Sequence, residues 1–203
     1  AGCIGFCGSI ESQAQLTSVV LTHGHLDHVC SLPVFAMNVA SHARRGVVVW
    51  ATDAVIASLR QDVFNGRAWP DFTTTTIGSE PLVRFIPITE RQPAHIGGLS
   101  VTPIPLNHPV PTVGYLVDDS RSAALFALDT GPTEEVWAIA ASHPRLSMAF
   151  VDAAFPDEME EFARASGHLT PALLATELRQ LPEAVRKIAT HLKPAYHDRI
   201  VGQ

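Results

Sequence analysis

The sequence predicts an α+β fold in which stacked sheets are flanked by helices, the αββα sandwich. Three observations predict it: eight short runs of β-branched and apolar residues, helix-start signals between several of these runs, and turn residues in the middle of the chain. Hairpins in the middle of the chain argue against a purely parallel, doubly wound sheet. No linker interrupts the 203 residues, so we expect a single domain over residues 1–203.

The expected strands are the runs rich in β-branched and apolar residues, namely Val19–Leu21, Val47–Trp50, Val83–Ile88, Leu99–Leu106, Thr112–Val117, Ala123–Leu128, Leu146–Val151 and Val185–Ala189. Two segments between them, His95–Gly98 and Asp118–Ser120, are typical of turns between antiparallel strands.

Helices are expected between the strands. They start near Ser31, near Thr52 or Asp53, and near Thr133. The clearest helix signal is Thr170-Pro171, an N-cap followed by proline at the first helical position, which leads into residues 172–180.

Composition limits the classes of partner. Hydrophobic residues make up 46% of the chain and charged residues 17%, which is enough apolar material for a sizeable core. The net charge is -6 and the lysines are Lys187 and Lys193 alone, which argues against binding long nucleic acid. No apolar run approaches the roughly 18 residues that a membrane span needs, so no membrane partner is expected. The negative net charge does not argue against a small anionic substrate, because bound divalent metal ions make the electrostatic potential at their site positive.

The cysteines bear on the compartment. Cys3, Cys7 and Cys30 are odd in number and form no CxxC pair, which favours unpaired thiols in a reducing compartment over a disulfide. We therefore expect a cytoplasmic location. A periplasmic location is the alternative, because the chain opens abruptly at Ala1 and we expect further residues to precede it.

The most informative segment is Thr22–His28, which follows the first predicted strand. It contains four potential metal ligands in six positions, His23, His25, Asp27 and His28. Buried this close together without a cation, these groups would repel one another or lose hydrogen-bond partners. Imidazole nitrogen and carboxylate oxygen suit Zn²⁺ and similar ions. We expect Gly24 to allow a tight turn, so that His23 and His25 converge on one ion.

Ligand-type residues also follow four of the later predicted strands. They are His108, Asp129, Asp152 and His191. Sheet folds collect their functional groups on loops at the edges of a rigid scaffold. Together with the first cluster, these residues predict a site for two metal ions.

The His23-Gly-His25-Leu-Asp27-His28 segment matches the HxHxDH signature, and on it the chain resembles the metallo-β-lactamase superfamily. More narrowly it resembles the class II 3′,5′-cyclic-nucleotide phosphodiesterases. The matching pieces are residues 21–29, 69–72, 113–115, 129–132, 154–156, 166–169 and 190–194. The Gly-His-Leu and Thr-His-Leu-Lys-Pro pieces narrow the resemblance to this branch. Members usually begin with a glycine-containing strand pair, so we expect a metallo-β-lactamase fold that lacks its N-terminal hairpin.

The resemblance implies a ligand set. One metal would be held by His23, His25 and His108, and the other by Asp27, His28 and His191. Asp129 would bridge both. The expected cofactors are two divalent ions, zinc first, with manganese or iron as alternatives. The resemblance also suggests a homodimer.

Two further roles come from the same resemblance. Asp27 would orient a metal-bridging hydroxide, and His168 would contact the scissile phosphate and protonate the leaving oxygen. A structural role for His168 is the alternative. Asp152 is either a hydrogen-bond partner of a ligating histidine or a strand-end cap. The aromatic residues Phe64, Trp69 and Phe72 are interpreted first as hydrophobic packing, and a platform for stacking a base is the alternative.

The function expected first is hydrolysis of a 3′,5′-cyclic nucleotide, such as cyclic AMP, to the 5′-nucleotide. The alternatives are an RNA 3′-end nuclease of the RNase Z type and a thiolester hydrolase of the glyoxalase II type. A basic patch or protruding arm for RNA is not recognisable in the sequence. A non-catalytic scaffold is less favoured, because every expected ligand position is filled.

Overall fold

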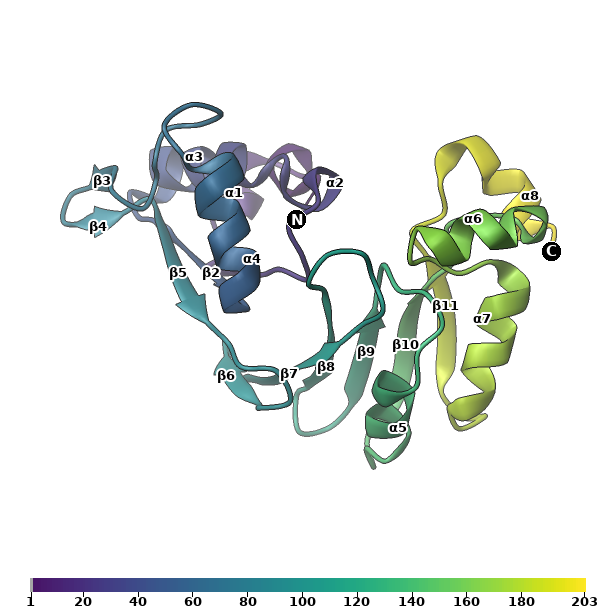
Figure 1. Ribbon diagram of the computed structural model, residues 1–203. Helices are drawn as coiled ribbons and strands as arrows, with labels where there is room; N and C mark the ends of the chain where they lie inside the picture. The colour runs from purple at the N-terminus through teal and green to yellow at the C-terminus, as the bar shows by residue number, and fades with distance from the viewer. Residues whose placement is uncertain (1) are drawn as a thin grey trace. The chain divides into compact units, whose positions relative to one another are not determined.

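The computed structural model describes residues 2–203, which fall into two compact units divided after Ile88. Unit 1 ends at Ile88 and unit 2 is Thr89–Gln203. Figure 1 colours unit 1 from purple to teal and unit 2 from teal to yellow. Within the described part of the chain, no helix is both long and apolar enough to cross a membrane. The expectation of a single domain over the whole chain stays a prediction.

Unit 1 is built on a three-stranded parallel sheet in the order β1-β2-β5. Ser18 of β1 lies opposite Val48 of β2, and Val47 of β2 lies opposite Val83 of β5. The strands of unit 1 are β1 (Ser18–Val20), β2 (Val47–Ala51), β3 (Thr76–Ile77), β4 (Glu80–Pro81) and β5 (Val83–Pro87). Its helices are α1 (Ile10–Gln13), α2 (Leu26–Val29), α3 (Leu32–Ala43) and α4 (Asp53–Ser58), with a 3-10 turn at Ile4–Phe6 and a π-helical turn at Leu59–Val63.

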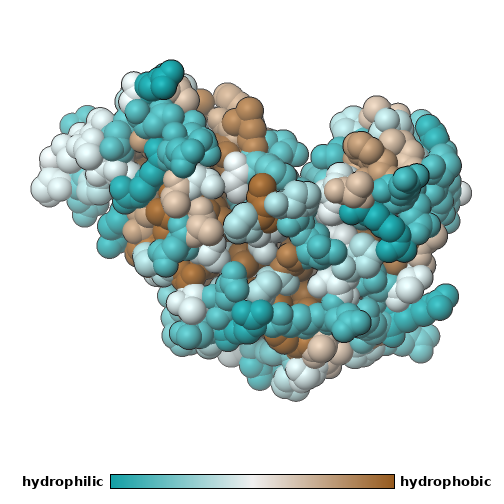
Figure 2. Space-filling model, viewed as in Figure 1, coloured by the Kyte–Doolittle hydropathy of each residue, from teal (hydrophilic) through white to brown (hydrophobic). Residues whose placement is uncertain are grey.

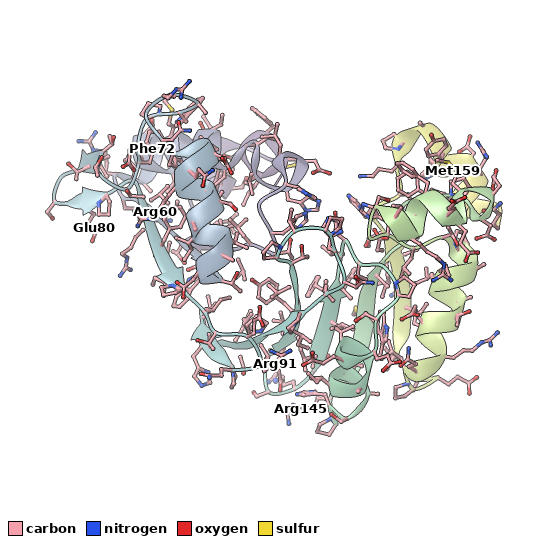
Figure 3. The ribbon with its side chains drawn as sticks, viewed as in Figure 1. Arg60, Phe72, Glu80, Arg91, Arg145 and Met159 are labelled. Carbon is pink, nitrogen blue, oxygen red and sulfur yellow. The ribbon has the colours of Figure 1, made fainter. Side chains whose placement is uncertain are left out.

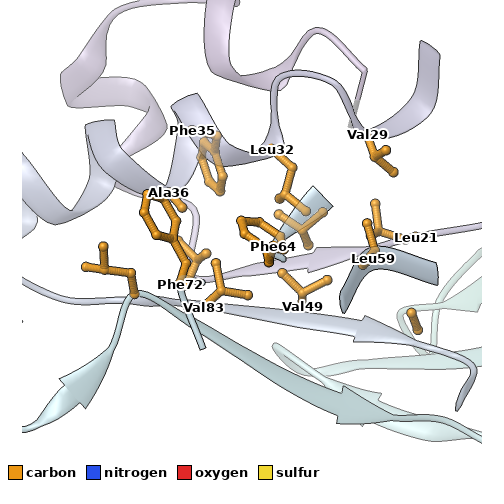
Figure 4. Packing of buried hydrophobic residues seen from close by; sticks show 14 of the residues in the cluster. Leu21, Val29, Leu32, Phe35, Ala36, Val49, Leu59, Phe64, Phe72 and Val83 are labelled. Atoms are coloured by element: carbon orange, nitrogen blue, oxygen red, sulfur yellow. The ribbon is translucent and has the colours of Figure 1, made fainter. Parts of the chain in front are cut away.

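The core of unit 1 lies between this sheet and its helices. Helix α3 buries Leu32, Phe35, Ala36 and Val39, whose spacing of three and four residues places them on one face. Figure 4 shows Phe35 and Ala36 in the same cluster as Val49 of β2. Burial of this stripe is what holds α3 to the sheet.

The aromatic segment after α4 also belongs to this core. Phe64 and Phe72 are buried, with ring centroids 5.7 Å apart. Trp69 packs edge-on against Phe72 at 6.2 Å. The packing interpretation is therefore confirmed for Phe64 and Phe72, whose buried rings lie in the cluster of Figure 4. Trp69 is partly buried against the same cluster.

Unit 2 contains a six-stranded mixed sheet in the order β11-β10-β9-β8-β7-β6. Strands β6 to β9 pair antiparallel, whereas β10 pairs parallel with both β9 and β11. The strands are β6 (Ala94–Ile96), β7 (Leu99–Pro105), β8 (Val113–Asp118), β9 (Ala123–Ala127), β10 (Leu146–Asp152) and β11 (Arg186–Thr190). The helices are α5 (Glu135–Ala141), α6 (Glu160–Ala165), α7 (Pro171–Glu177) and α8 (His197–Val201), with 3-10 turns at Asp157–Met159, Leu178–Gln180 and Pro194–Tyr196.

The parallel pairings of β10 require helical crossovers. Helix α5 connects β9 to β10, and α6 with α7 connects β10 to β11 (Figure 1). Trp137 of α5 and Leu173 of α7 join Leu125 of β9 and Ala149 of β10 in one buried cluster. The predicted N-cap of α7 is confirmed, since the Thr170 hydroxyl accepts a hydrogen bond from the Leu173 amide.

The sequence located the eight predicted strands and the predicted helix starts to within one or two residues, whereas α1, α6 and α8 were not predicted. The predicted turn at His95–Gly98 was partly wrong, because His95 and Ile96 pair with Ser100 and Leu99 in β6. The turn itself consists of Gly97 and Gly98, which both have positive φ. The β3–β4 hairpin was missed, because two-residue strands carry too little pattern to detect.

Hydrophobic surface is limited on the face drawn in Figure 2, where hydrophilic residues predominate and hydrophobic residues form small separate patches. The large hydrophobic side chains that are exposed include Phe6, Leu26, Phe162 and Val201. Scattered exposure of this kind is normal for a folded chain.

Candidate metal centre

The first set of predicted ligands lies in unit 1, between β1 and α2. The Leu21 amide still bonds to the Trp50 carbonyl at 3.0 Å, so the chain leaves the sheet only after Leu21. His25 then occupies the N-cap position of α2 with an extended backbone, and its carbonyl accepts a hydrogen bond from the His28 amide at 3.0 Å. A buried strand and a short helix therefore hold the two ends of the ligand loop.

The three histidines of this loop gather around a fully buried one. His23 is 0% exposed, and its ring centroid lies 4.7 Å from that of His25 and 4.3 Å from that of His28. The Thr22 hydroxyl lies 3.0 Å from His23 Nδ1 and helps to fix the ring. Asp27 Oδ2 lies 3.6 Å from His28 Nε2. These predicted ligands are thus brought together within unit 1.

This donor set fits a divalent metal ion. Three imidazoles lie close together here, and one of them is fully buried. Neutral imidazole nitrogens with one carboxylate are the ligands that zinc, iron and manganese share.

Gly24 serves this loop differently from the prediction. Its φ is not among the positive values of the chain, so the turn does not depend on a left-handed glycine. A Cβ at this position would instead lie 3.2 Å from Cβ of Ser58, at the end of α4. Gly24 therefore allows the ligand loop to pack closely against α4.

The second set of predicted ligands lies in unit 2, on one edge of the six-stranded sheet. The carboxyl ends of β7, β9, β10 and β11 share this edge, because β8 runs antiparallel to β7 and β9 while β9, β10 and β11 are parallel. His108, Asp129, Asp152 and His191 stand at or just beyond these four ends. The expected recurrence of ligand-type residues at strand ends thus places them along a common edge.

Side chains at this edge form two candidate ligand groups. His108, Asp129 and His168 offer ligand atoms that lie within 4.8 Å of one another, and so do Asp152, His168 and His191. The His168 ring centroid lies 5.2 Å from that of His108 and 5.3 Å from that of His191. The sequence-based prediction set His168 apart from the ligands, whereas the geometry places its ring nitrogens within both groups.

Two of these residues have an unusual backbone conformation. Asp129 has φ of 51° and His191 has φ of 60°, both in the left-handed region that disfavours residues with a Cβ. Such strain costs of order 1–3 kcal/mol and persists where the surroundings fix the residue. At both positions the strained residue carries a ligand-type side chain and follows closely on the end of a strand.

Asp152 connects two histidines of the site. Its Oδ1 lies 3.0 Å from His191 Nδ1 and 3.3 Å from His168 Nδ1, and its Oδ2 accepts a 2.6 Å hydrogen bond from the Leu169 amide. The carboxylate is fully buried. Of the two sequence-based interpretations of Asp152, the geometry bears out the hydrogen-bond partner of a histidine predicted to bind metal.

The electrostatics at His191 favour a cation. Burial works to lower the pKa of His191, but the hydrogen bond to Asp152 and the charge of Asp129 outweigh it and raise this pKa. The same two carboxylates that stabilise a proton on this ring would stabilise a metal ion beside it.

The loop that carries His168 is held by its backbone. The His168 amide donates to the Ala163 carbonyl at 2.8 Å, and the Gly167 carbonyl lies 3.0 Å from His108 Nδ1. Gly167 has φ of 69°, and a Cβ there would lie 2.7 Å from Cδ of Pro109. Glycine is therefore required for this loop to approach the one that carries His108.

Asn107 is a site residue whose role the sequence analysis missed. Its side chain donates to the Pro132 carbonyl at 2.8 Å, and its own carbonyl accepts from the Gly131 amide at 2.8 Å. These bonds tie the loop of His108 to the loop of Asp129. The available signal was its position directly before His108, but nothing local indicates which loop it would contact.

A family model described as a β-lactamase superfamily domain matches residues 7–192 of the chain. The chain belongs to this superfamily. The chain accordingly has the metallo-β-lactamase fold, and the predicted α+β class is confirmed.

Two curated relatives share the branch that the sequence motifs indicated. A protein of Yersinia pestis named as a probable 3′,5′-cyclic-nucleotide phosphodiesterase is 24% identical, over 91% of this chain and 59% of its own length. The 3′,5′-cyclic-nucleotide phosphodiesterase 1 of Saccharomyces cerevisiae is 25% identical, over 90% of this chain and 58% of its own. The chain therefore spans somewhat less than two thirds of the length of these relatives.

A solved structure supports the fold. The crystal structure of unliganded yeast PDE1 superposes with a TM-score of 0.82 at 22% identity, covering 95% of this chain and 63% of that one. At this level of identity the superposition establishes the metallo-β-lactamase fold and leaves the chemistry to the side chains of the site.

Proposed function

We propose that this protein is a metal-dependent phosphodiesterase that hydrolyses 3′,5′-cyclic nucleotides to 5′-nucleotides. The observation that carries the proposal is the contact between Asp152 and His168. It places His168, a potential general acid, next to the ligand-type side chains of unit 2. The names of the two curated relatives support the choice of substrate class.

The proposal includes the ligand assignment that the family resemblance implies. His23, His25 and His108 would hold one divalent ion, with Asp27, His28 and His191 on the second and Asp129 shared. This assignment rests on the sequence motifs. When bound, the ions would supply an activated water and neutralise charge on the phosphoryl oxygens. Zinc is the metal proposed first.

His168 is proposed as the acid for the leaving group. Its Nδ1 faces Asp152 Oδ1 at 3.3 Å, which leaves Nε2 as the nitrogen that can face substrate. The buried Asp152 carboxylate orients the ring, so that Nε2 can give a proton to the departing 3′-oxygen. An alkoxide is a poor leaving group near neutral pH, and the proton transfer is what makes its departure feasible.

The second proposed catalytic residue is Asp27, the exposed carboxylate of the unit 1 loop. Its side chain is 58% exposed and lies beside His28. We propose that it accepts a hydrogen bond from the attacking water and orients it toward phosphorus.

The test is elemental analysis of the purified protein, coupled to assays with cyclic AMP and with bis(p-nitrophenyl) phosphate. We expect close to two metals per chain and release of 5′-AMP. Cleavage of the synthetic diester alone would keep the chemistry and reject the substrate. Absence of both metal and hydrolysis after reconstitution with zinc, manganese or iron would reject the proposal.

A further inference from the structure

Lys193 lies beside a predicted metal ligand, and no role has yet been given to it. Its Nζ is 3.3 Å from Nε2 of His191, and the side chain is half-buried. The other ring nitrogen of His191, Nδ1, faces Asp152. The ammonium group therefore lies on the side of the ring that is turned away from the supporting carboxylate, where a ligand of His191 would be reached.

The backbone fixes the base of this side chain. The Lys193 amide donates to the Ala154 carbonyl at 3.4 Å, and the residue has an extended conformation with φ of -68° and ψ of 126°. Pro194 follows and begins a 3-10 turn, which restricts Lys193 to this region of conformational space. The ammonium group thus projects from a constrained segment of chain at the same sheet edge as His191.

Two arginines of unit 2 form ion pairs away from the candidate ligands. Arg91 pairs with Glu135 and Arg145 pairs with Asp118. Arg145 immediately precedes β10, at the end opposite to Asp152, and Figure 3 shows it with Arg91 at the far end of the unit 2 sheet from Met159. Lys193 is by contrast a cation at the edge where the candidate ligands gather.

An ammonium group gains more from a phosphate oxygen than from a neutral imidazole. An ammonium donor and a phosphate oxygen carry opposite charges, so their hydrogen bond gains an attraction that an uncharged acceptor does not provide. Lysine also binds phosphate as a point charge on a flexible stem, which lets it follow an entering anion over a short distance. The contact with His191 engages the ring nitrogen that the proposed metal ion would take, so metal binding would release the ammonium group to pair with a phosphoryl oxygen.

We propose that Lys193 binds a non-bridging phosphoryl oxygen of the substrate and of the product. This rests on the proposed function for the class of substrate, but the anion site itself can be tested without turnover. The residue contributes binding and charge neutralisation, and it transfers no proton.

The probe is inorganic phosphate, and its dissociation constant is measured by calorimetry on the metal-loaded protein. Lys193→Met removes the charge and keeps the length of the side chain. We expect the dissociation constant of phosphate to rise about 10- to 100-fold, the range for losing one hydrogen bond to a charged group. Lys193→Arg should restore most of the affinity.

Lys187 provides the matched control. It is the other lysine of the chain, it stands near the start of β11, and its Nζ donates to the Pro182 carbonyl at 3.2 Å. Lys187→Met makes the same change in net charge and should leave the phosphate affinity unaltered. An equal loss of phosphate affinity in both variants would mean that net charge alone causes the effect, and this result would overturn the proposal.

Two further outcomes decide the matter. If Lys193→Met loses metal along with phosphate, Lys193 supports His191 and does not bind the anion. If phosphate affinity is unchanged, the proposal is wrong whether or not the wild-type protein cleaves cyclic AMP. Conversely, a wild-type protein that binds phosphate through Lys193 but cleaves no diester would reject the proposed function and leave the anion site standing.

Discussion

The two units supply their ligand-type residues in different ways. In unit 1 they come from one short segment, and a buried strand and a four-residue helix set their geometry. In unit 2 they come from four strand ends and a helix connection spread over more than 80 residues, from His108 to His191. The first arrangement is encoded locally, whereas the second exists only when the sheet has formed. Substitutions in unit 2 should accordingly act through distant partners, and those in unit 1 through neighbours in sequence.

The largest effect is expected from Asp129→Ala. The side chain stands in a left-handed backbone conformation among His108, His168 and His191, and the proposal makes it a ligand of both ions. We expect metal content and hydrolysis to fall together, by more than the 10- to 100-fold typical of losing a residue behind a ligand. Asp129→Asn keeps a residue that tolerates this backbone conformation and isolates the loss of charge. Full metal occupancy in the alanine variant would contradict the bridging assignment.

His168→Ala should separate catalysis from metal binding. We expect metal content to be retained and kcat for cyclic AMP to fall about 10²- to 10⁴-fold, the usual scale for general acid catalysis. A substrate with a better leaving group, bis(p-nitrophenyl) phosphate, should lose less, because it needs less protonation. Loss of metal instead would make His168 a ligand, in line with its place in both ligand groups of unit 2.

Phe35→Ala tests how far unit 1 depends on its core. Phe35 is fully buried on α3, and its removal leaves a cavity, so we expect the free energy of unfolding to fall by about 3–5 kcal/mol in urea denaturation. Phe6→Ala is the control in the same unit, because that side chain is 71% exposed. It should change stability by about 0.5 kcal/mol or less. Similar losses for both would show that the packing around Phe35 is not what the structure describes.

The supporting residues of the two units can be compared directly. Asp152 contacts two histidines and an amide in unit 2, whereas Thr22 contacts His23 alone in unit 1. Asp152→Asn should weaken zinc binding about 10- to 100-fold, and Thr22→Val should weaken it less. Competition with a fluorescent chelator measures both. The reverse order would mean that the loop of unit 1 relies on its hydroxyl more than the sheet edge relies on its carboxylate.

The smallest effect is expected at the opposite edge of the unit 2 sheet. The hydrogen bond from Arg145 holds the pKa of Asp118 below its ordinary value. Because this pKa is lowered by folding, the pair stabilises the protein above the unfolded pKa of about 4 and ceases to do so as the pH falls through the folded pKa. Thermal melts from pH 7 to pH 2 should show this loss in the wild type and a smaller one in Arg145→Met. Identical profiles would remove the pair from the acid response.

Much of the fold could be predicted because local pattern and final structure agree. The β-branched runs became strands, and Thr170-Pro171 became the start of α7, since capping and backbone preference act over a few residues. The clustering of the ligand-type residues from His23 to His28 could be predicted for the same reason, because a strand, a turn and a helix start bring their side chains together. Gly24 shows where prediction from local pattern ends. Glycine is needed there because the loop packs against Ser58, which is distant in sequence.

The sequence by itself determined the residue types at the site, the order of strands and helices, and membership of a superfamily recognisable from one short motif. Only the tertiary structure decided that Asp152 serves both His168 and His191, that Asn107 ties two loops together, and that Lys193 lies against His191. The physical reason is the range of the interactions. Propensities, caps and turns act between neighbours along the chain, whereas these hydrogen bonds depend on strand order and register, which bring residues from separate loops to one edge of a sheet.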